Sequence, residues 1–94
     1  NGCLGMVRQW QELFYNKRYS GVDLTGSPDF VKLAEAYGAS GIRVKDKKEV
    51  KAALKKAIAT PGPVLIDFHV EPEENVYPMV PTGKAINQMI EGMA

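Results

Sequence analysis

The stretch GIRVKDKKEVKAALKKAIATPGPVLIDFHV, residues 41–70, contains the pattern that decides the fold. It begins with a short apolar run at 41–44 and ends with residues 64–70, whose branched and aromatic side chains predict a buried strand. Between these runs, apolar side chains recur at the helical period. A strand, a helix and a strand within about 30 residues form a βαβ unit, and its long crossover makes the two strands parallel.

The limits of the crossover helix are also written in the sequence. Asp46 and Glu49 have the acid-x-x-Glu spacing of a capping box, and the TPGP sequence at 60–63 cannot continue a helix. The expected fold class is therefore α/β, a parallel sheet with flanking helices. Since parallel strands normally belong to larger, doubly covered sheets, the sheet is expected to be truncated on its N-terminal side.

Two helices are predicted before this unit. Residues 4–17 carry apolar groups at spacings of three and four, which favours a helix with one broad buried face. After a polar loop, Ser27 is the expected N-cap of a second helix, with Pro28 at its first position and Asp29 at its positive end. Gly38 supplies the expected left-handed stop after Tyr37.

The last quarter of the chain is predicted to be mostly loop. Residues 71–81 contain three prolines, yet their apolar side chains are too many for an idle linker and should be covered. Residues 84–93 are expected to form a short helix whose inward side chains are Ile86, Met89 and Ile90.

Composition limits the function classes. The 94 residues allow one small domain, and a net charge of +1 with lysines diluted by acids gives no nucleic-acid footprint. There is no apolar run of about 18 residues, so no membrane partner is expected. The single cysteine, Cys3, excludes an internal disulfide and is compatible with a reducing compartment, which indicates a cytoplasmic protein.

The residues alone nominate little chemistry. Cys3 lies 66 positions from the sole histidine, His69, so no nucleophile and base are paired, and no cysteine or histidine spacing suits zinc. Asn1 and the turn at Gly2 instead offer hard oxygen atoms, the type that magnesium prefers beside phosphates. The glycine-punctuated start that leads into Trp10 is typical of a site whose other half precedes residue 1, so a fragment is expected.

The context comes from a resemblance that covers nearly all 94 residues in order. The pattern Asn-x-x-x-Gly-Met-Val-x-Gln-Trp-Gln at 1–11, Gly-Pro-Val-Leu at 62–65 and Val-Tyr-Pro-Met-Val-Pro at 76–81 resembles the carboxyl-terminal part of the acetolactate synthase (acetohydroxyacid synthase) large catalytic subunit. The first and last of these motifs are the specific ones. The resemblance implies a partial thiamine-diphosphate-binding (pyrophosphate) domain.

The resemblance divides that domain and assigns its site. Residues 1–3 end the metal and diphosphate motif, residues 4–19 form the active-site helix, residues 27–70 the α/β core and residues 71–94 the carboxyl-terminal tail. Cofactor-binding positions are Asn1, Cys3 and Met6. Asn1 would bind Mg²⁺ through its side chain and Cys3 through its backbone carbonyl, while Met6 would contact thiamine diphosphate.

The same resemblance implies a substrate channel lined by Met6, Val7 and Trp10, in which Trp10 selects the second ketoacid. The helix and the tail would close over the site when cofactor binds. The parent enzyme would condense pyruvate with pyruvate or 2-ketobutyrate in branched-chain amino-acid biosynthesis.

The departures from the family are equally informative. No catalytic residue of the family falls in this chain, and the FAD of the parent would bind outside it, so the isolated chain is expected to be inactive. The expected partners are the remainder of the large subunit and further copies in a homodimer or higher oligomer, and a regulatory small subunit is left open.

Two alternatives remain at this point. In the first, the parent is another thiamine-diphosphate carboligase, of the glyoxylate or sulfoacetaldehyde type. The chain is otherwise a self-associating structural module without activity, which buries its open sheet edge against a copy of itself.

Overall fold

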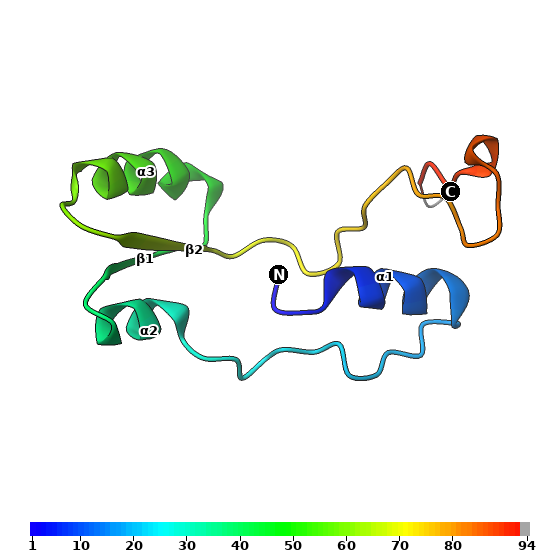
Figure 1. The fold of residues 1–94 in the computed structure, drawn as a ribbon, viewed down its shortest axis with the longest axis horizontal. Coiled ribbons are helices and arrows are strands. Elements are labelled where there is room, and N and C mark those ends of the chain that lie inside the picture. The colour runs from blue at the N-terminus through cyan, green and yellow to red at the C-terminus, as the bar shows by residue number, and fades with distance from the viewer. Residues whose placement is uncertain (93–94) are drawn as a thin grey trace. The chain divides into compact units, whose positions relative to one another are not determined.

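Two parallel strands form a sheet (Figure 1). In the computed structural model, which describes residues 1–92, β1 (Ser40–Val44) pairs with β2 (Val64–Phe68) in a register that sets Ser40 opposite Val64. The 3-10 helix η1 (Lys47–Glu49) and the helix α3 (Val50–Ala59) connect the two strands. The predicted βαβ unit and the parallel α/β class are confirmed.

The described chain forms two compact units. The strand unit comprises Asn1–Gly2 and Leu24–Pro72. The helix–tail unit comprises Cys3–Asp23 and the described residues from Glu73 onward.

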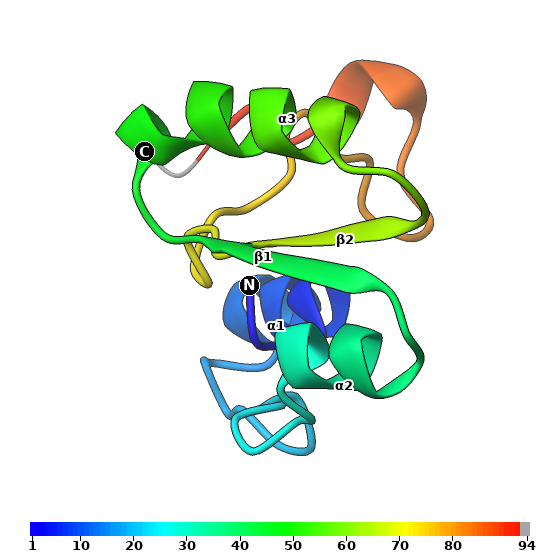
Figure 2. The same cartoon turned by 90° about the vertical axis from the view of Figure 1, so that its left-hand side faces the viewer.

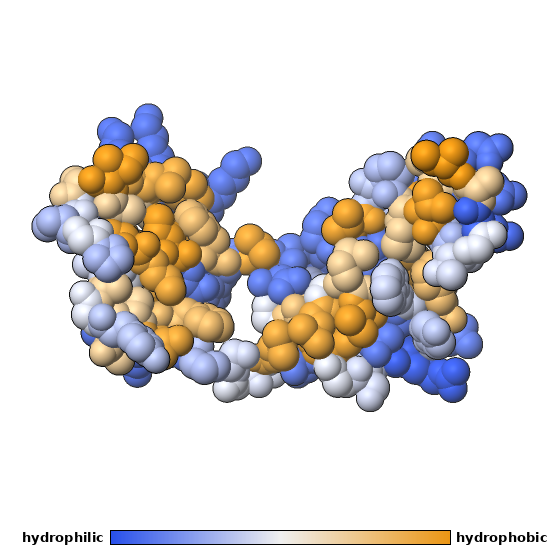
Figure 3. All heavy atoms as spheres, viewed as in Figure 1, coloured by the Kyte–Doolittle hydropathy of each residue, from blue (hydrophilic) through white to orange (hydrophobic). Residues whose placement is uncertain are grey.

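Helices cover both faces of the sheet in the strand unit. Helix α3 lies on one face and α2 (Phe30–Ala36) on the other, in both views of the fold (Figures 1 and 2). The buried apolar side chains of this unit are small: Ala34 of α2, Val44 of β1 and Ala53 of α3. Several larger ones are 40% or more exposed, among them Phe30, Leu33 and Leu54, and apolar surface is visible over this unit in Figure 3.

The crossover begins with the predicted capping box. The Asp46 carboxylate accepts a hydrogen bond from the Lys48 amide at 2.8 Å, and Glu49 accepts one from the Asp46 amide at 3.1 Å. These bonds satisfy amides that the first turn leaves without helical partners. Past Thr60, the turn at Gly62 has a φ of 87°, which suits glycine and leads into β2.

Helix α2 has a different N-cap from the predicted one. Asp29, not Ser27, accepts hydrogen bonds from the amides of Val31 and Lys32, at 3.1 and 3.2 Å. The helix consequently starts at Phe30 rather than at Pro28, because the aspartate side chain reaches the free amides itself. The predicted stop is correct, since Gly38 has a φ of 76°.

Arg43 of β1 ties α2 to the strands. Its guanidinium pairs with the capping carboxylate of Asp29 and, through Nε at 3.3 Å, with Asp67 of β2. The hydrogen bond from Arg43, assisted by the backbone bond from Lys32, lowers the pKa of Asp29 below its ordinary value of 3.8. The same two carboxylates raise the pKa of Arg43, Asp29 contributing most.

The helix–tail unit is built on α1 (Gly5–Phe14). The predicted helix is present, but the prediction of a buried apolar face is wrong. Arg8 and Gln9 are the buried residues of α1, at 8% and 1% exposure, and Leu13 is half-buried, whereas four large apolar side chains remain 41–50% exposed: Met6, Val7, Trp10 and Phe14. The helix turns a polar side inward because that side binds the tail, as described below.

The predicted helix at 84–93 is not formed over the described part of that range. Only a 3-10 turn, η2 (Ile86–Gln88), is present, and Ile86 is 77% exposed. Ile90 instead pairs with Met79 in an antiparallel bridge, with N···O distances of 2.9 and 2.7 Å. Backbone pairing across the tail has replaced helical bonds, and residue 93 lies outside the described residues.

Within residues 1–92, no helix has the length and apolar character needed to cross a membrane.

Gly41 generates a packing prediction. A Cβ at this position would stand 2.9 Å from the Val31 carbonyl oxygen and 3.0 Å from its Cα, both backbone atoms of α2. Gly41→Ala must therefore separate α2 from β1, and we expect a loss of about 1–3 kcal/mol in the free energy of unfolding, measured by urea denaturation. Gly92→Ala, which meets nothing within 4 Å, is the control; equal midpoints for both variants would contradict the packing role.

The Asp29–Arg43 pair generates a pH prediction. Because the folded-state pKa of Asp29 is lowered, its stabilisation is present above the unfolded value of 3.8 and is lost as pH falls through the lower folded value. We expect the free energy of unfolding to fall more steeply below pH 3.8 in the wild type than in Arg43→Gln. Arg18→Gln removes an equal charge from a residue that contacts only the Tyr15 carbonyl in the described bonds, and should keep the wild-type slope.

Candidate functional site

Each unit contains a cavity suited to a ligand among its described residues. The cavity of the strand unit, about 580 Å³, lies where β1 and β2 end. Its wall includes Asn1, the loop that precedes α2, and the charged side chains of Arg43, Asp67 and His69. Carboxyl ends of parallel strands are the usual location of ligand sites in open α/β sheets.

The charges on this wall largely neutralise one another. Arg43 faces two carboxylates, Asp29 and Asp67, and His69 Nε2 lies 3.1 Å from the same Asp67 oxygen. The cluster of Arg43, Asp29 and Asp67 carries one excess negative charge. It therefore lacks the positive side-chain charge that would hold a phosphate, and it is more compatible with a cation.

Asn1, the predicted metal ligand, is exposed and lies on the wall of this cavity. The Gly2 that follows has a φ of 63°, and its carbonyl accepts a hydrogen bond from the Leu24 amide at 2.9 Å. Gly2 thus has the left-handed backbone conformation that a tight turn needs, and the role predicted for the turn stays a prediction. Among the described residues, no three histidine, cysteine, aspartate or glutamate side chains gather into a metal-binding group.

Cys3, the second predicted ligand, belongs to the helix–tail unit. It is half-buried and pairs with Asp23 in an isolated antiparallel bridge, which the bond from the Leu4 amide to the Val22 carbonyl continues at 2.9 Å. The donor set fits Mg²⁺ in part. An asparagine oxygen and a backbone carbonyl are suitable hard ligands, but they fill only two of about six positions, so phosphates and other groups must complete the shell.

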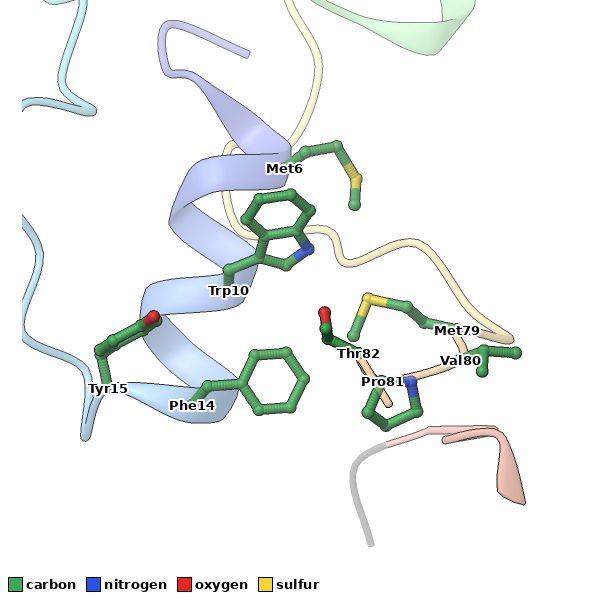
Figure 4. A pocket seen from close by; sticks show the side chains of 8 residues that line it. All are labelled: Met6, Trp10, Phe14, Tyr15, Met79, Val80, Pro81 and Thr82. Carbon is green, nitrogen blue, oxygen red and sulfur yellow. The ribbon is translucent and has the colours of Figure 1, made fainter. Parts of the chain in front are cut away.

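The cavity of the helix–tail unit is smaller, about 330 Å³, and mostly apolar (Figure 4). Met6, Trp10 and Phe14 stand one turn apart along one side of α1 and face the tail segment. Eight residues line it: Met6, Trp10, Phe14, Tyr15, Met79, Val80, Pro81 and Thr82. A mostly apolar pocket with two hydroxyl groups, those of Tyr15 and Thr82, is typical of a site for a small organic molecule.

Three predicted site residues lie on α1 near this cavity, and the structure separates them. Met6 and Trp10 come together on its wall, with 43% and 50% of their surface exposed. Val7, one position further round the helix, is 41% exposed and is not among the lining residues.

Gln9 attaches the tail to α1. Its amide Nε2 donates to the Val76 carbonyl at 2.9 Å, and its Oε1 accepts from the Val76 amide at 2.8 Å. Nε2 also lies 3.6 Å from the Met79 sulfur. The side chain is only 1% exposed, so every one of its polar atoms must be satisfied within the protein.

Arg8 forms a second attachment beside the first. Its guanidinium pairs with Glu12 at 2.9 Å and donates to the Glu73 carbonyl at 2.8 Å and to Asn75 Oδ1 at 2.5 Å. Asn75 in turn donates to Glu12 at 3.0 Å. The bond from Asn75, followed by that from Arg8, lowers the pKa of Glu12 despite the opposing effect of burial. The carboxylate therefore stays ionised in the folded unit.

Sequence reasoning missed Arg8, Gln9 and Asn75. Polar residues on an amphipathic helix are ordinarily solvated, so nothing local marks them as buried. The available signal was indirect: the tail had more apolar residues than an idle linker, and the helix had a polar side able to bind its backbone.

Comparison with known proteins identifies a family for most of the chain. Residues 1–68 match the family described as thiamine pyrophosphate enzyme, C-terminal TPP binding domain. The chain is 51% identical over 91 residues to an acetolactate synthase large subunit of Cyanidium caldarium, covering 96% of this chain and 16% of that protein.

Relatives from other lineages are similar. The acetolactate synthase isozyme 2 large subunit of Escherichia coli (strain K12) is 44% identical over 94 residues, covering 100% of this chain and 17% of that protein. The mitochondrial acetolactate synthase of Schizosaccharomyces pombe is 48% identical over 86 residues, covering 92% and 13%.

The chain thus spans 13–17% of the length of these three relatives. The resemblance inferred from the motifs is confirmed. Because the family match covers well over half of its residues, this chain belongs to the family of the thiamine pyrophosphate enzyme C-terminal TPP-binding domain.

Proposed function

We propose that this chain is the carboxyl-terminal part of an acetolactate synthase large subunit. The whole protein is a thiamine-diphosphate-dependent transferase that condenses pyruvate with pyruvate or 2-ketobutyrate in branched-chain amino-acid biosynthesis. One observation carries the proposal: the two most specific motifs of the chain meet in one pocket. Met6 and Trp10 come from the first motif, and Met79, Val80 and Pro81 come from the last.

The pocket suits a small ketoacid with an alkyl end. Trp10 and Phe14 offer flat aromatic walls, and the thioethers of Met6 and Met79 are flexible apolar groups that adapt to the ligand. Such walls exclude water from the reacting carbons. Since 2-ketobutyrate has one methylene more than pyruvate, contact with the half-exposed Trp10 ring favours the larger acid. Val7 then belongs to the entrance of the channel.

The cofactor assignments are part of the same proposal. Asn1 binds Mg²⁺ through its side-chain oxygen and Cys3 through its backbone carbonyl, while Met6 packs against thiamine diphosphate. When bound, that cofactor supplies the electron sink for carbon–carbon bond formation. The FAD of the parent binds outside these residues, and no catalytic residue is assigned within them.

The partners are proposals too. They are the remainder of the large subunit, a second copy of that subunit, and a regulatory small subunit if one is present. The cytoplasmic location expected from the single cysteine stays a prediction.

The proposed function makes a prediction about the isolated chain. Residues 1–94 lack a proton-transfer group assigned to the reaction, so the purified chain with pyruvate, thiamine diphosphate, Mg²⁺ and FAD should form no acetolactate. A colorimetric acetoin assay measures this, with the full-length protein as the positive control. Turnover by the 94-residue chain would show that the catalytic assignment is wrong.

The proposed function also makes a prediction about which second ketoacid the full-length protein prefers. Trp10→Leu removes the aromatic wall, so the ratio of the 2-ketobutyrate product to acetolactate should fall roughly tenfold or more, because one methylene in an apolar pocket is worth about 1–3 kcal/mol. Product analysis by chromatography measures the ratio. Tyr37→Leu, which removes an aromatic ring that is 84% exposed in the strand unit, is the matched control.

The outcomes separate the candidate enzymes. A full-length protein that condenses glyoxylate or forms sulfoacetaldehyde-derived products, and makes no acetolactate, belongs to another carboligase type. An unchanged product ratio in Trp10→Leu contradicts only the role assigned to Trp10 and leaves the proposed reaction standing.

A further inference from the structure

The Gln9 side chain binds the tail as a neighbouring strand would. A carboxamide presents one N–H donor and one carbonyl acceptor side by side, as the N–H and C=O of a single strand residue do towards a neighbouring strand. Gln9 uses both on the same residue, accepting from the Val76 amide and donating to the Val76 carbonyl. The pairing fixes the backbone of Val76 in position and in orientation, which a single hydrogen bond would not do.

Gln11 makes the same kind of contact with another segment. Its Nε2 donates to the Ser20 carbonyl at 3.0 Å, and its Oε1 accepts from the Ser20 amide at 3.2 Å. Two helical positions differ by about 200° around the axis, so the glutamines reach opposite sides of α1. Trp10 lies between them, and its ring faces the cavity (Figure 4).

The position of Val76 decides where the opposite wall of the cavity stands. Met79 follows three residues later and is held by the Gln9 amide near its sulfur and by the bridge to Ile90. Val80, Pro81 and Thr82, which line the cavity, continue directly from it. Gln9 itself is 1% exposed and does not line the cavity, so it acts on a ligand only through the tail.

We infer that Gln9 is a positioning residue of the ketoacid pocket: its amide sets the distance between Trp10 and the Met79–Thr82 wall. The inference rests on the proposed function for the identity of the ligand. The role of Gln9 in holding the tail does not depend on that function. Arg8 and Asn75 hold the start of the same tail segment, whereas Gln9 alone contacts Val76 and Met79 among the side-chain bonds described.

The test uses the full-length protein that contains this chain, with Gln9→Met and Gln11→Met as a matched pair. Each change keeps side-chain length and removes a two-sided contact with a backbone. Hydrogen–deuterium exchange is read by mass spectrometry on peptides that cover residues 73–82 and 18–23. We expect about tenfold faster exchange at 73–82 in Gln9→Met only, and at 18–23 in Gln11→Met only.

Kinetics give the second readout. Gln9→Met should raise KM for 2-ketobutyrate as second substrate and lower its product ratio several-fold, with a smaller change in kcat for acetolactate. Gln11→Met should leave the ratio at its wild-type value. Gln9→Glu keeps the oxygen that accepts from the Val76 amide but sets a second carboxylate oxygen against the Val76 carbonyl, so its exchange at 73–82 should be at least as fast, and its product ratio at least as low, as in Gln9→Met.

Several results would overturn the inference. Wild-type exchange at 73–82 in both Gln9 variants would show that the amide does not hold the tail. Faster exchange with an unaltered product ratio would show that the tail does not shape the pocket. If Gln9→Met does not fold, Gln9→Glu decides by the same two readouts. A wild-type protein that forms no acetolactate contradicts the proposed function instead, and exchange then decides whether Gln9 positions the tail.

Discussion

The helix–tail unit depends on the hydrogen-bonded contact between the buried amide of Gln9 and the backbone of Val76. A helix can turn only one side inward, and in α1 the inward side carries Arg8 and Gln9. The tail is thereby bound through its backbone at Glu73 and Val76 and through the side chain of Asn75. The apolar row of α1 is left facing a cavity instead of a core, which is how a ten-residue helix comes to present Trp10 and its neighbours to a ligand.

The strand unit is stabilised by close packing of small side chains and by ion pairs, and its buried apolar side chains are not large ones. Gly41 lets α2 approach β1 to backbone contact, and the buried side chains around it are alanine and valine. Arg43 then connects the cap of α2 with the second strand. These features place the loop before α2 beside the ends of both strands, where Asn1 also lies, so the wall of this cavity is set by the fold itself.

Much of the strand unit could be predicted from the sequence because its signals are local. The Asp46–Glu49 box, the TPGP break and the apolar period define β1, α3 and β2 within a few residues. Asp29 and Ser27 compete as caps two residues apart, and only the geometry of the turn decides between them. The helix expected at 84–93 failed because its apolar spacing did not show that Ile90 would pair with Met79.

The site was predictable to a smaller extent. Met6 and Trp10 were identified through the resemblance, while the roles of Asn1 and Cys3 stay predictions. The polar contacts of Gln9 could not be predicted, since they join residues 67 positions apart and use side chains that are usually solvated.

The order of the two units along the chain affects how the protein folds during its synthesis on the ribosome. Residues 24–72 are continuous, so the strand unit, apart from its first two residues, can assemble as soon as they leave the ribosome. The helix–tail unit is discontinuous in sequence. Until Val76 has been synthesised, the Gln9 amide and the Arg8 guanidinium of α1, which are buried in the complete unit, remain exposed to water. Closing a loop of that length carries an entropic cost that grows only slowly with its size. A ribosome pause after residue 72 would therefore leave a folded strand unit and an α1 without the partner that completes the ligand pocket.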